Sequence, residues 1–320
     1  MEENKLILKY IQKLSKNNPY ALKLNDDVFF DKKKKIVLSV DTYNEGIHFF
    51  DIKKPNLLIK KILRSSISDL ICKGVKPKYY FISASLKKDI FKKKHFNKII
   101  KSLQEEQNKY DIVISGGDTS VAKFFSFTIV SLGYSSKIIK RNNVKLNDDI
   151  YVTGNIGDSY LGLSFIRKKI KKYNLKQRNY FINKYYKPDL PYNFYKFILK
   201  FANSSIDISD GLIEDLKKLI NNQKIGFKID LNLIPTSKIF DTILSDNNMI
   251  KENQLFNGDD YQILFTAPKK NRRLIYKYAN KMNQKITIIG QILSNSSGYR
   301  LYKGKTSLKI GNYRGYSHNF

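Results

Sequence analysis

The chain has 320 residues, of which 42% are hydrophobic and 13% aromatic. This composition excludes a disordered chain, and the length predicts two domains of roughly 150 residues each. No apolar run of about 18 residues occurs, so we expect no membrane span, and the first residues lack the pattern of a secretory signal. The single cysteine, Cys72, excludes an internal disulfide and favours a reducing, cytoplasmic location.

The chain is strongly basic, with 59 Lys and Arg against 28 Asp and Glu and a formal net charge of +31. Such a charge is common in proteins that bind nucleic acid. These proteins gather their basic residues on one face, with exposed aromatic rings that stack on bases. Here the basic residues are spread along the whole chain among many Ile, Asn and Tyr residues. This pattern favours compositional drift at the surface over a nucleic-acid partner.

Apolar periodicity predicts helices and strands in alternation. In the first half we expect helices at 5–16, 55–73 and 88–107 and strands at 36–40, 79–85, 111–115 and 124–133. After a polar connection we expect helices at 158–172, 176–186, 191–202, 211–222 and 270–282, and strands at 151–154, 227–231, 261–267, 286–293 and 299–302. The alternation predicts an α/β (α+β) fold in two domains, 1–148 and 149–320.

The acidic residues, unlike the basic ones, recur in short clusters beside Gly, Ser or Asn, which permit tight turns. The clusters are Asn25-Asp26-Asp27, Val40-Asp41-Thr42, Ser68-Asp69, Gly116-Gly117-Asp118, Gly157-Asp158-Ser159, Asp207–Gly211 and Gly258-Asp259-Asp260. Any one of them is typical of a turn or a helix cap. Several follow strand-like runs, however, which favours one shared carboxylate site. Asp69 lies near the C-terminal end of a predicted helix, where the helix dipole predicts a compensating cation.

Carboxylates gathered from separate strand ends indicate Mg²⁺, which is usually held by one or two carboxylates together with substrate phosphates. Phosphoryl transfer depends mainly on positioning and charge neutralisation, which such a site provides. A P-loop is absent, because Gly304-Lys305-Thr306 lacks the first glycine at the required distance. Three histidines and one cysteine are too few for a histidine-and-cysteine zinc site. The residues therefore predict a magnesium-dependent phosphotransferase.

Taken in order, the motifs resemble those of thiamine-monophosphate kinases over nearly the whole chain. In the first half these motifs are Leu38–Thr42, Glu45–Phe49, Ser68-Asp69, Gly74–Pro77, Ser115–Ser120, and Arg141 with Asp148. In the second half they are Tyr151–Gly154, Gly157–Ser159, Asp207–Leu212, Gly258–Tyr261, Leu264–Thr266, Ile289–Ile292 and Gly315–His318. Each motif is modest alone, but the ordered set is specific.

The resemblance implies the two-domain fold of aminoimidazole ribonucleotide synthetase, with a homodimer formed through the N-terminal strands. It implies direct in-line transfer of the ATP γ-phosphate to thiamine monophosphate, assisted by several Mg²⁺ ions. The implied metal ligands are Asp27, Ser39, Asp41, Asp69, Asp118, Asp207 and Asp210, with Val40 through its carbonyl. The implied nucleotide contacts are Gly117, Asp118, Arg141 and Ser209, and the implied contacts to thiamine monophosphate are His48, Asp259 and Tyr316.

The sequence departs from the family pattern at four places. Leu24-Asn25 replaces a glycine before the first Asp-Asp pair, and Asp259 replaces a glutamate. The aromatic residue expected ahead of the Gly-Gly-Asp motif is replaced near Ile100, and Val121 replaces an arginine. None of these changes removes an implied carboxylate ligand.

Two kinds of alternative stay open. Another ATP-using enzyme of the same superfamily, of the purine-synthesis type, fits the same fold, although the Asp207–Leu212 and Gly258–Thr266 motifs favour thiamine. Some individual residues also have ordinary interpretations. His48 fits a packed side chain, Tyr316 fits the C-terminal core and Ser209 fits a turn.

Overall fold

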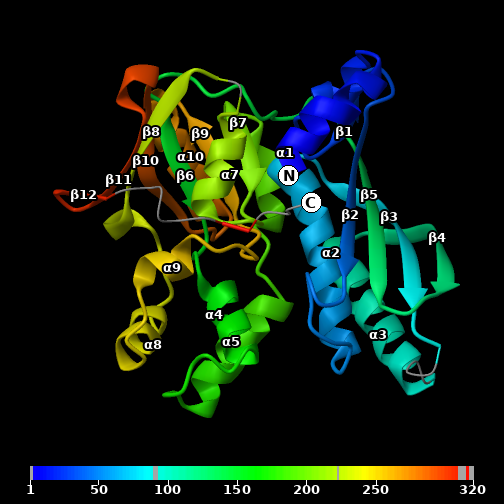
Figure 1. Ribbon diagram of the computed structural model, residues 1–320. Helices are drawn as coiled ribbons and strands as arrows, with labels where there is room; N and C mark the ends of the chain where they lie inside the picture. The colour runs from blue at the N-terminus through cyan, green and yellow to red at the C-terminus, as the bar shows by residue number, and fades with distance from the viewer. Residues whose placement is uncertain (1–2, 89–92, 222, 309–314, 317–320) are drawn as a thin grey trace.

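The computed structural model describes residues 3–88, 93–221, 223–308 and 315–316. Its strands form two sheets, one in each half of the chain, with helices packed against them (Figure 1). The N-terminal sheet has the order β1-β2-β5-β3-β4. Its strands are β1 (Phe29–Asp31), β2 (Ile36–Asn44), β3 (Pro77–Leu86), β4 (Val113–Val121) and β5 (Ser126–Tyr134). β3 and β4 are parallel, and the other neighbours are antiparallel.

The C-terminal sheet has the order β12-β11-β8-β10-β6-β9-β7. Its strands are β6 (Asp149–Thr153), β7 (Ser204–Asp207), β8 (Ile225–Asp230), β9 (Ile263–Ala267), β10 (Ile286–Ser294), β11 (Tyr299–Lys303) and β12 (Thr306–Leu308). β6 and β7 both pair antiparallel with β9, so these two strands run in the same direction. Their C-terminal ends therefore lie at the same edge of the sheet as the start of β9.

Ten α-helices lie within the described residues. They are α1 (Glu3–Leu6), α2 (Pro55–Cys72), α3 (Lys93–Tyr110), α4 (Asp158–Ile166), α5 (Leu175–Tyr186), α6 (Tyr195–Ile198), α7 (Leu212–Leu219), α8 (Phe240–Asp246), α9 (Lys251–Leu255) and α10 (Arg272–Lys281). Short π- or 3₁₀-helical segments are η1 (Ile7–Ile11), η2 (Gln12–Ser15), η3 (Pro19–Leu24), η4 (Tyr192–Phe194), η5 (Leu231–Leu233), η6 (Lys269–Asn271) and η7 (Asn295–Ser297). The mixed architecture confirms the predicted fold class.

Helix α2 lies between the two halves (Figure 1). It begins with Pro55, whose fixed φ suits a first helical turn, and it is buried on nearly all sides. One side packs on β2 and β5, and another side packs on β7 and α5 of the second half. Because side chains alternate along a strand, Ser39, Asp41 and Tyr43 of β2 share the face turned toward α2.

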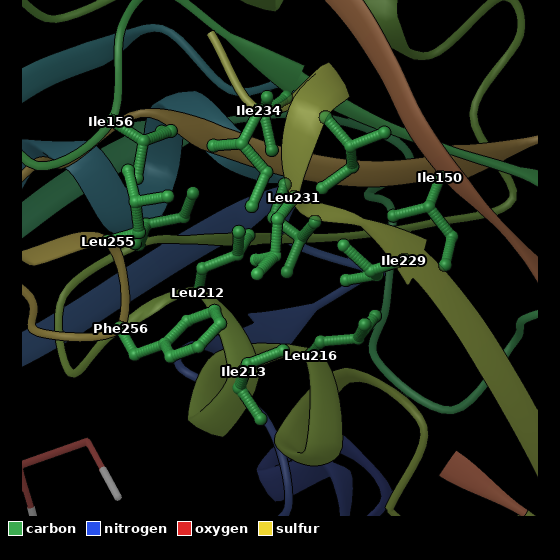
Figure 2. Close-up of a cluster of buried hydrophobic side chains, with 14 of the residues drawn as sticks. Ile150, Ile156, Leu212, Ile213, Leu216, Ile229, Leu231, Ile234, Leu255 and Phe256 are labelled. Atoms are coloured by element: carbon green, nitrogen blue, oxygen red, sulfur yellow. The ribbon is translucent and has the colours of Figure 1, made fainter. Parts of the chain in front are cut away.

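A hydrophobic cluster fixes α7 against the C-terminal sheet. Figure 2 shows Leu212, Ile213 and Leu216 of the helix meeting Ile229 of β8 and Phe256, and each is 1% exposed or less. Burying each such side chain contributes about 1.5–3 kcal/mol relative to leaving it in water. The packing therefore holds the start of α7, and with it the preceding loop, in one position.

The two sheets divide between Tyr134 and Asp149, in the connection that contains the predicted domain boundary. A second hydrophobic cluster nevertheless joins the halves, because Ile67 and Ile129 belong to the same buried group as Phe265. The boundary at 148/149 stays a prediction. None of the described helices combines the length and apolar character that a membrane crossing needs.

Several predicted elements differ from the structure. The helix expected at 158–172 ends at Ile166, because Lys168 adopts a left-handed conformation. The helix expected at 191–202 is reduced to η4 and one turn of α6, whose residues Phe194 and Ile198 are buried in the cluster that joins the halves. The short strand β7 and the helices α8 and α9 were not predicted. The predicted helix at 88–107 begins among the described residues at Lys93, and residues 89–92 lie outside them.

The predicted helix at 5–16 is an irregular run of α1, η1 and η2. Its expected inward face is not buried, since Tyr10, Ile11 and Leu14 are 54%, 40% and 76% exposed. The apolar residues recur at helical spacing, but no other part of the chain that the structure describes covers these side chains.

A buried ion pair links α2 to α3. Arg64 donates from Nε to Glu106 Oε2 at 2.7 Å and from its terminal nitrogen to Oε1 at 2.9 Å. A third donor reaches the Pro188 carbonyl at 3.1 Å, so the same guanidinium also ties α2 to the second half. Both charged side chains are almost fully buried, so the loss of either one would leave the other as a buried charge without its partner.

We expect Arg64→Met to lower the free energy of unfolding by about 3–5 kcal/mol, because it leaves the Glu106 charge buried without its ion-pair partner, with Lys60 3.8 Å away. Urea denaturation followed by circular dichroism measures this loss. The matched control is Lys76→Met, which breaks the solvent-exposed pair with Asp111 and should cost less than about 1 kcal/mol. Equal losses in the two variants would contradict the assignment.

Candidate active site

The candidate site lies at the edge of the C-terminal sheet where β6 and β7 end and β9 begins. Three of the sequence motifs meet there, at Gly154–Asp158 after β6, at Asp207–Gly211 at the end of β7, and at Gly258–Asp260 before β9. The backbone N–H of Asp259 donates to the Ser209 carbonyl at 2.9 Å, which joins two of these loops directly. Helix α2 brings the first half of the chain to the same edge, since Ser68 Oγ donates to Asp207 Oδ2.

Three carboxylates from separate elements meet at this junction: Asp41 on β2, Asp69 on α2 and Asp207 on β7. Ser39 Oγ donates to Asp69 Oδ2 at 2.7 Å and lies 3.4 Å from Asp41 Oδ2. Asp69 and Asp207 are buried, and Asp41 is partly buried. The structure thus brings together four of the predicted metal ligands, counting Ser39. We call Asp41, Asp69 and Asp207 the carboxylate cluster.

The carboxylate cluster carries raised pKa values. Burial, and after it repulsion from Asp207, raises the pKa of Asp41 to about 7. Burial and then the charges of Asp41 and Asp207 raise the pKa of Asp69 well above its usual range. Burial also raises the pKa of Asp207. A carboxylate that is buried beside other carboxylates resists ionisation until a positive charge relieves the repulsion.

The donor chemistry of the carboxylate cluster fits Mg²⁺, which prefers hard oxygen ligands. Among the residues that the structure describes, no three Asp, Glu, His or Cys side chains converge tightly enough to form a finished metal site. The fit to Mg²⁺ therefore rests on the repulsion among the carboxylate oxygens of the cluster, because a divalent ion would balance their negative charge.

Asp27, another predicted metal ligand, is already paired with cations. Lys73 Nζ lies 2.8 Å from Asp27 Oδ2 and 2.8 Å from Asp26 Oδ1. Arg141 Nε donates to Asp27 Oδ2 at 3.0 Å, and its terminal nitrogen pairs with Asp27 Oδ1. The structure thus places the predicted nucleotide contact Arg141 directly on the predicted metal ligand Asp27. Sequence reasoning missed Lys73, because one lysine among many carries no signal of its burial.

Asp215 fixes the loop that carries Ser209 and Asp210 through hydrogen bonds to its backbone. Asp215 Oδ2 accepts the backbone N–H groups of Ser209, Asp210 and Gly211, each at 3.0 Å. Gly211 has a φ of +127°, and an added Cβ would lie 2.0 Å from the Phe256 carbonyl oxygen, so only glycine fits there. The Asp210 carboxylate pairs with Lys218. Sequence reasoning also missed Asp215. Its position in the first turn of a predicted helix could have indicated a residue that binds the N-terminal N–H groups of that helix.

The predicted substrate contacts His48 and Asp259 lie around Tyr185 of α5. Tyr185 donates its hydroxyl to the His48 carbonyl at 3.1 Å, and its ring lies 3.6 Å from Lys61 Nζ. Lys61 Nζ in turn is 2.7 Å from Asp259 Oδ1, and Tyr261 donates to the same oxygen at 3.0 Å. The Lys61 side chain is 2% exposed, and burial lowers the pKa of Lys61.

Tyr316, the third predicted substrate contact, lies at the same loops. Its backbone N–H donates to the Asp210 carbonyl at 2.9 Å, and Gly315 packs closely on Asp210 and Glu214. Residues 315 and 316 thus lie beside the start of α7. His48 and Asp259 are thus linked through Tyr185 and Lys61, and Tyr316 contacts the neighbouring loop at Asp210.

Gly117 and Asp118 are not brought to the carboxylate cluster. Across the N-terminal sheet, Asp41 aligns with Ile129, Ile82 and then Gly117, which is three strands away. This separation is about 14 Å at about 4.8 Å per strand. Asp118 aligns with Thr42 on the opposite, exposed face, and the whole of β4 is exposed. The side chain of Val40 also faces that side and is 57% exposed, and the metal-binding role of the Val40 carbonyl stays a prediction.

Comparisons with known proteins agree with this architecture. Residues 22–134 match the family model "AIR synthase related protein, N-terminal domain". The thiamine-monophosphate kinase of Buchnera aphidicola from Schizaphis graminum is 35% identical over 315 residues, covering 96% of this chain and 95% of the relative. That of Escherichia coli K12 is 28% identical, covering 99% and 98%. The solved structure of AaThiL complexed with AMPPCP and TMP superposes with a TM-score of 0.84 at 25% identity, covering 100% and 99% of the two chains. These matches confirm the predicted fold, and the chain belongs to the thiamine-monophosphate kinase family.

Proposed function

We propose that this protein transfers the γ-phosphate of ATP to thiamine monophosphate, giving thiamine diphosphate and ADP. The observation that carries the proposal is the convergence of Asp41 and Asp69 from the first half with Asp207 from the second. Membership of the thiamine-monophosphate kinase family supports the acceptor, as does the solved relative that holds AMPPCP and TMP.

Asp41, Asp69 and Asp207 would hold Mg²⁺, which when bound neutralises the charge on the phosphate oxygens. Ser39 and Ser68 position these carboxylates by donating hydrogen bonds to them. Direct transfer needs no protein nucleophile, because the acceptor phosphate itself attacks the γ-phosphorus in line with the departing ADP. The task of the side chains is then to orient the two phosphates and balance their charge.

On the nucleotide side, Ser209 and Asp210 are set in place by the three hydrogen bonds to Asp215. Ser209 is the proposed nucleotide contact of this loop. Arg141 is the second contact, since its guanidinium suits bidentate binding of phosphate. Rigid backbone support of this kind lowers the reorganisation needed in the transition state.

On the acceptor side, Lys61 and Tyr261 both contact Oδ1 of Asp259 within the described part of the chain. This arrangement leaves Oδ2 to accept a hydrogen bond from thiamine monophosphate. Lys61 is therefore a positioning residue, which fixes the acid that is one methylene shorter than the family's glutamate. His48 and Tyr316 complete the proposed contacts.

We also propose a homodimer formed through the N-terminal sheet. The sheet exposes apolar side chains on and near its edge strand β4, with Val113, Ile114, Val121 and Phe124 between 43% and 72% exposed. Since Gly117 and Asp118 lie away from the carboxylate cluster of their own protomer, supply of these residues across the dimer interface fits their predicted roles in nucleotide and metal binding.

A cytoplasmic location completes the proposal. Cys72 is a free, buried thiol, which suits a reducing compartment where ATP is available. The proposal includes no nucleic-acid partner, because the basic residues are spread along the whole chain.

Purified protein supplied with ATP, Mg²⁺ and thiamine monophosphate should form thiamine diphosphate and ADP in equal amounts, as measured by liquid chromatography. Asp207→Asn should lower kcat by at least about 100-fold, because it removes charge from the phosphate site. The control Asp246→Asn, at an exposed position of α8, should keep wild-type activity. Turnover of a formylglycinamidine ribonucleotide without any thiamine diphosphate would overturn the proposal.

The carboxylate cluster predicts how pH changes stability. Because its pKa values are raised in the folded protein, protonation stabilises the fold at low pH and this contribution is lost as the pH rises through about 7, the value for Asp41. In EDTA, the Tm should fall between pH 5 and pH 8, and Mg²⁺ should raise it more at pH 8 than at pH 5.

In Asp41→Asn the fall of Tm with pH and the Mg²⁺ effect should both be smaller, as measured by thermal unfolding. Asp246→Asn is again the control and should follow the wild type. An Asp41→Asn variant with an unchanged pH response would remove Asp41 from the repelling cluster.

Lys61→Met should raise the KM for thiamine monophosphate about tenfold and leave the KM for ATP within about twofold, because it frees Asp259 without touching the nucleotide loops. Initial-rate kinetics with each substrate varied in turn measure the two values. The control Lys60→Met, one residue earlier on α2 and paired with Glu105, should change neither KM. A parallel rise in both values would indicate a general structural effect instead.

A further inference from the structure

Lys73 is a buried cation enclosed by oxygen atoms. Its side chain follows the last residue of α2 and is 0% exposed. Nζ lies 2.8 Å from Asp26 Oδ1 and 2.8 Å from Asp27 Oδ2, and donates to the Ser205 carbonyl at 2.9 Å. An ammonium group has three N–H donors. Three oxygens from two distant segments therefore account for all of them, much as oxygen ligands enclose a metal ion.

The charges around the Asp26-Asp27 pair balance without any metal. The two carboxylates face two cations, Lys73 and Arg141, and Arg141 also donates its backbone N–H to Asp26 at 2.9 Å. The carboxylate cluster differs in kind, because Asp69 and Asp207 receive their hydrogen bonds from the neutral hydroxyls of serines. The charges of Lys73 and Arg141 also act on Asp207, and that of Lys73 on Asp69, but none of the described ion pairs joins a cation to Asp41, Asp69 or Asp207. The negative charge of the carboxylate cluster is therefore only partly balanced, whereas that of Asp26-Asp27 is balanced.

The loop before the pair is also unusual. Leu22, Lys23 and Leu24 all have positive φ values, between 49° and 59°, in the stretch where the family pattern has a glycine. Non-glycine residues adopt this conformation uncommonly. The loop is anchored by Asn221, which donates to Asn25 Oδ1 at 3.0 Å. The Asp-Asp pair is therefore presented by a backbone that departs from the family pattern at the same place.

We propose that the Lys73 ammonium permanently takes the place of a metal ion at Asp26-Asp27, so that Asp27 binds no Mg²⁺ in this protein. Divalent ions are then confined to the carboxylate cluster and its neighbours. This inference rests on the proposed function, because it concerns which carboxylates hold metal for phosphoryl transfer. It reverses the role that family resemblance implies for Asp27.

Arg141 is not the cation that takes the place of the metal, since its side chain is 15% exposed and is also a proposed nucleotide contact. Lys73 stays in place, because it has no solvent-exposed surface and no other acceptor to turn to among its described contacts. A divalent ion brought to Asp27 would lie beside this buried ammonium, where the repulsion between like charges is screened much less than at the surface.

The test counts bound Mn²⁺ by electron paramagnetic resonance on the full-length protein with AMPPCP. Asp27→Asn should bind as many Mn²⁺ ions per protomer as the wild type, with affinities within about twofold. Asp207→Asn should lose an ion or bind it at least about tenfold more weakly, as removal of a true ligand does. Loss of one Mn²⁺ in Asp27→Asn would overturn the inference and leave the proposed function standing.

Lys73→Met provides the opposite test, because it leaves the Asp26-Asp27 pair without its fixed cation. This variant should gain one Mn²⁺ per protomer, and an unchanged count in the folded variant would overturn the inference. The matched control Lys76→Met, which loses an exposed lysine three residues later, should keep the wild-type count. If Lys73→Met does not fold, as judged by circular dichroism, Asp27→Asn decides alone. A wild-type protein that binds no Mn²⁺ beyond that held by AMPPCP would instead contradict the metal site of the proposed function.

Discussion

Repulsion among Asp41, Asp69 and Asp207 is the constraint around which the two halves of this molecule are arranged. The three carboxylates come from β2, α2 and β7, and each is carried there by an element whose other side chains are packed in a hydrophobic core. Folding thus forces like charges together, at a cost that the raised pKa values report. A site that is unfavourable in the free protein is well suited to attract cations and the phosphates that accompany them.

The structure balances negative charge in two different ways. Lys73 and Arg141 neutralise the carboxylates of Asp26 and Asp27 within the protein itself. At the carboxylate cluster, neutral serine hydroxyls hold the carboxylates in position without neutralising them. The first arrangement is permanent, and the second depends on what binds. Only carboxylates that no cation of the protein neutralises can bind the ions that assist phosphoryl transfer.

Backbone support makes the second half of the site rigid. Asp215 holds three consecutive N–H groups of the loop before α7, and α7 itself is locked by its apolar face (Figure 2). On the acceptor side, Lys61 and Tyr261 hold one oxygen of Asp259. The residues that would touch substrates are therefore positioned by residues that do not, and these supporting side chains are buried.

The sequence alone determined the mixed fold, the family and most of the acids that meet at the site, because apolar periodicity and turn-forming neighbours are local properties. It also indicated a cation near Asp69 at the end of α2. Only the tertiary structure decided which lysines are internal, since the burial of Lys73 depends on Asp26 and Ser205, far away in the chain. It also separated Asp118 from the carboxylate cluster, because strand order and the facing of side chains across a sheet are set by long-range pairing. These distant contacts give Asp27 a lysine as its partner and give Asp207 a neutral serine hydroxyl.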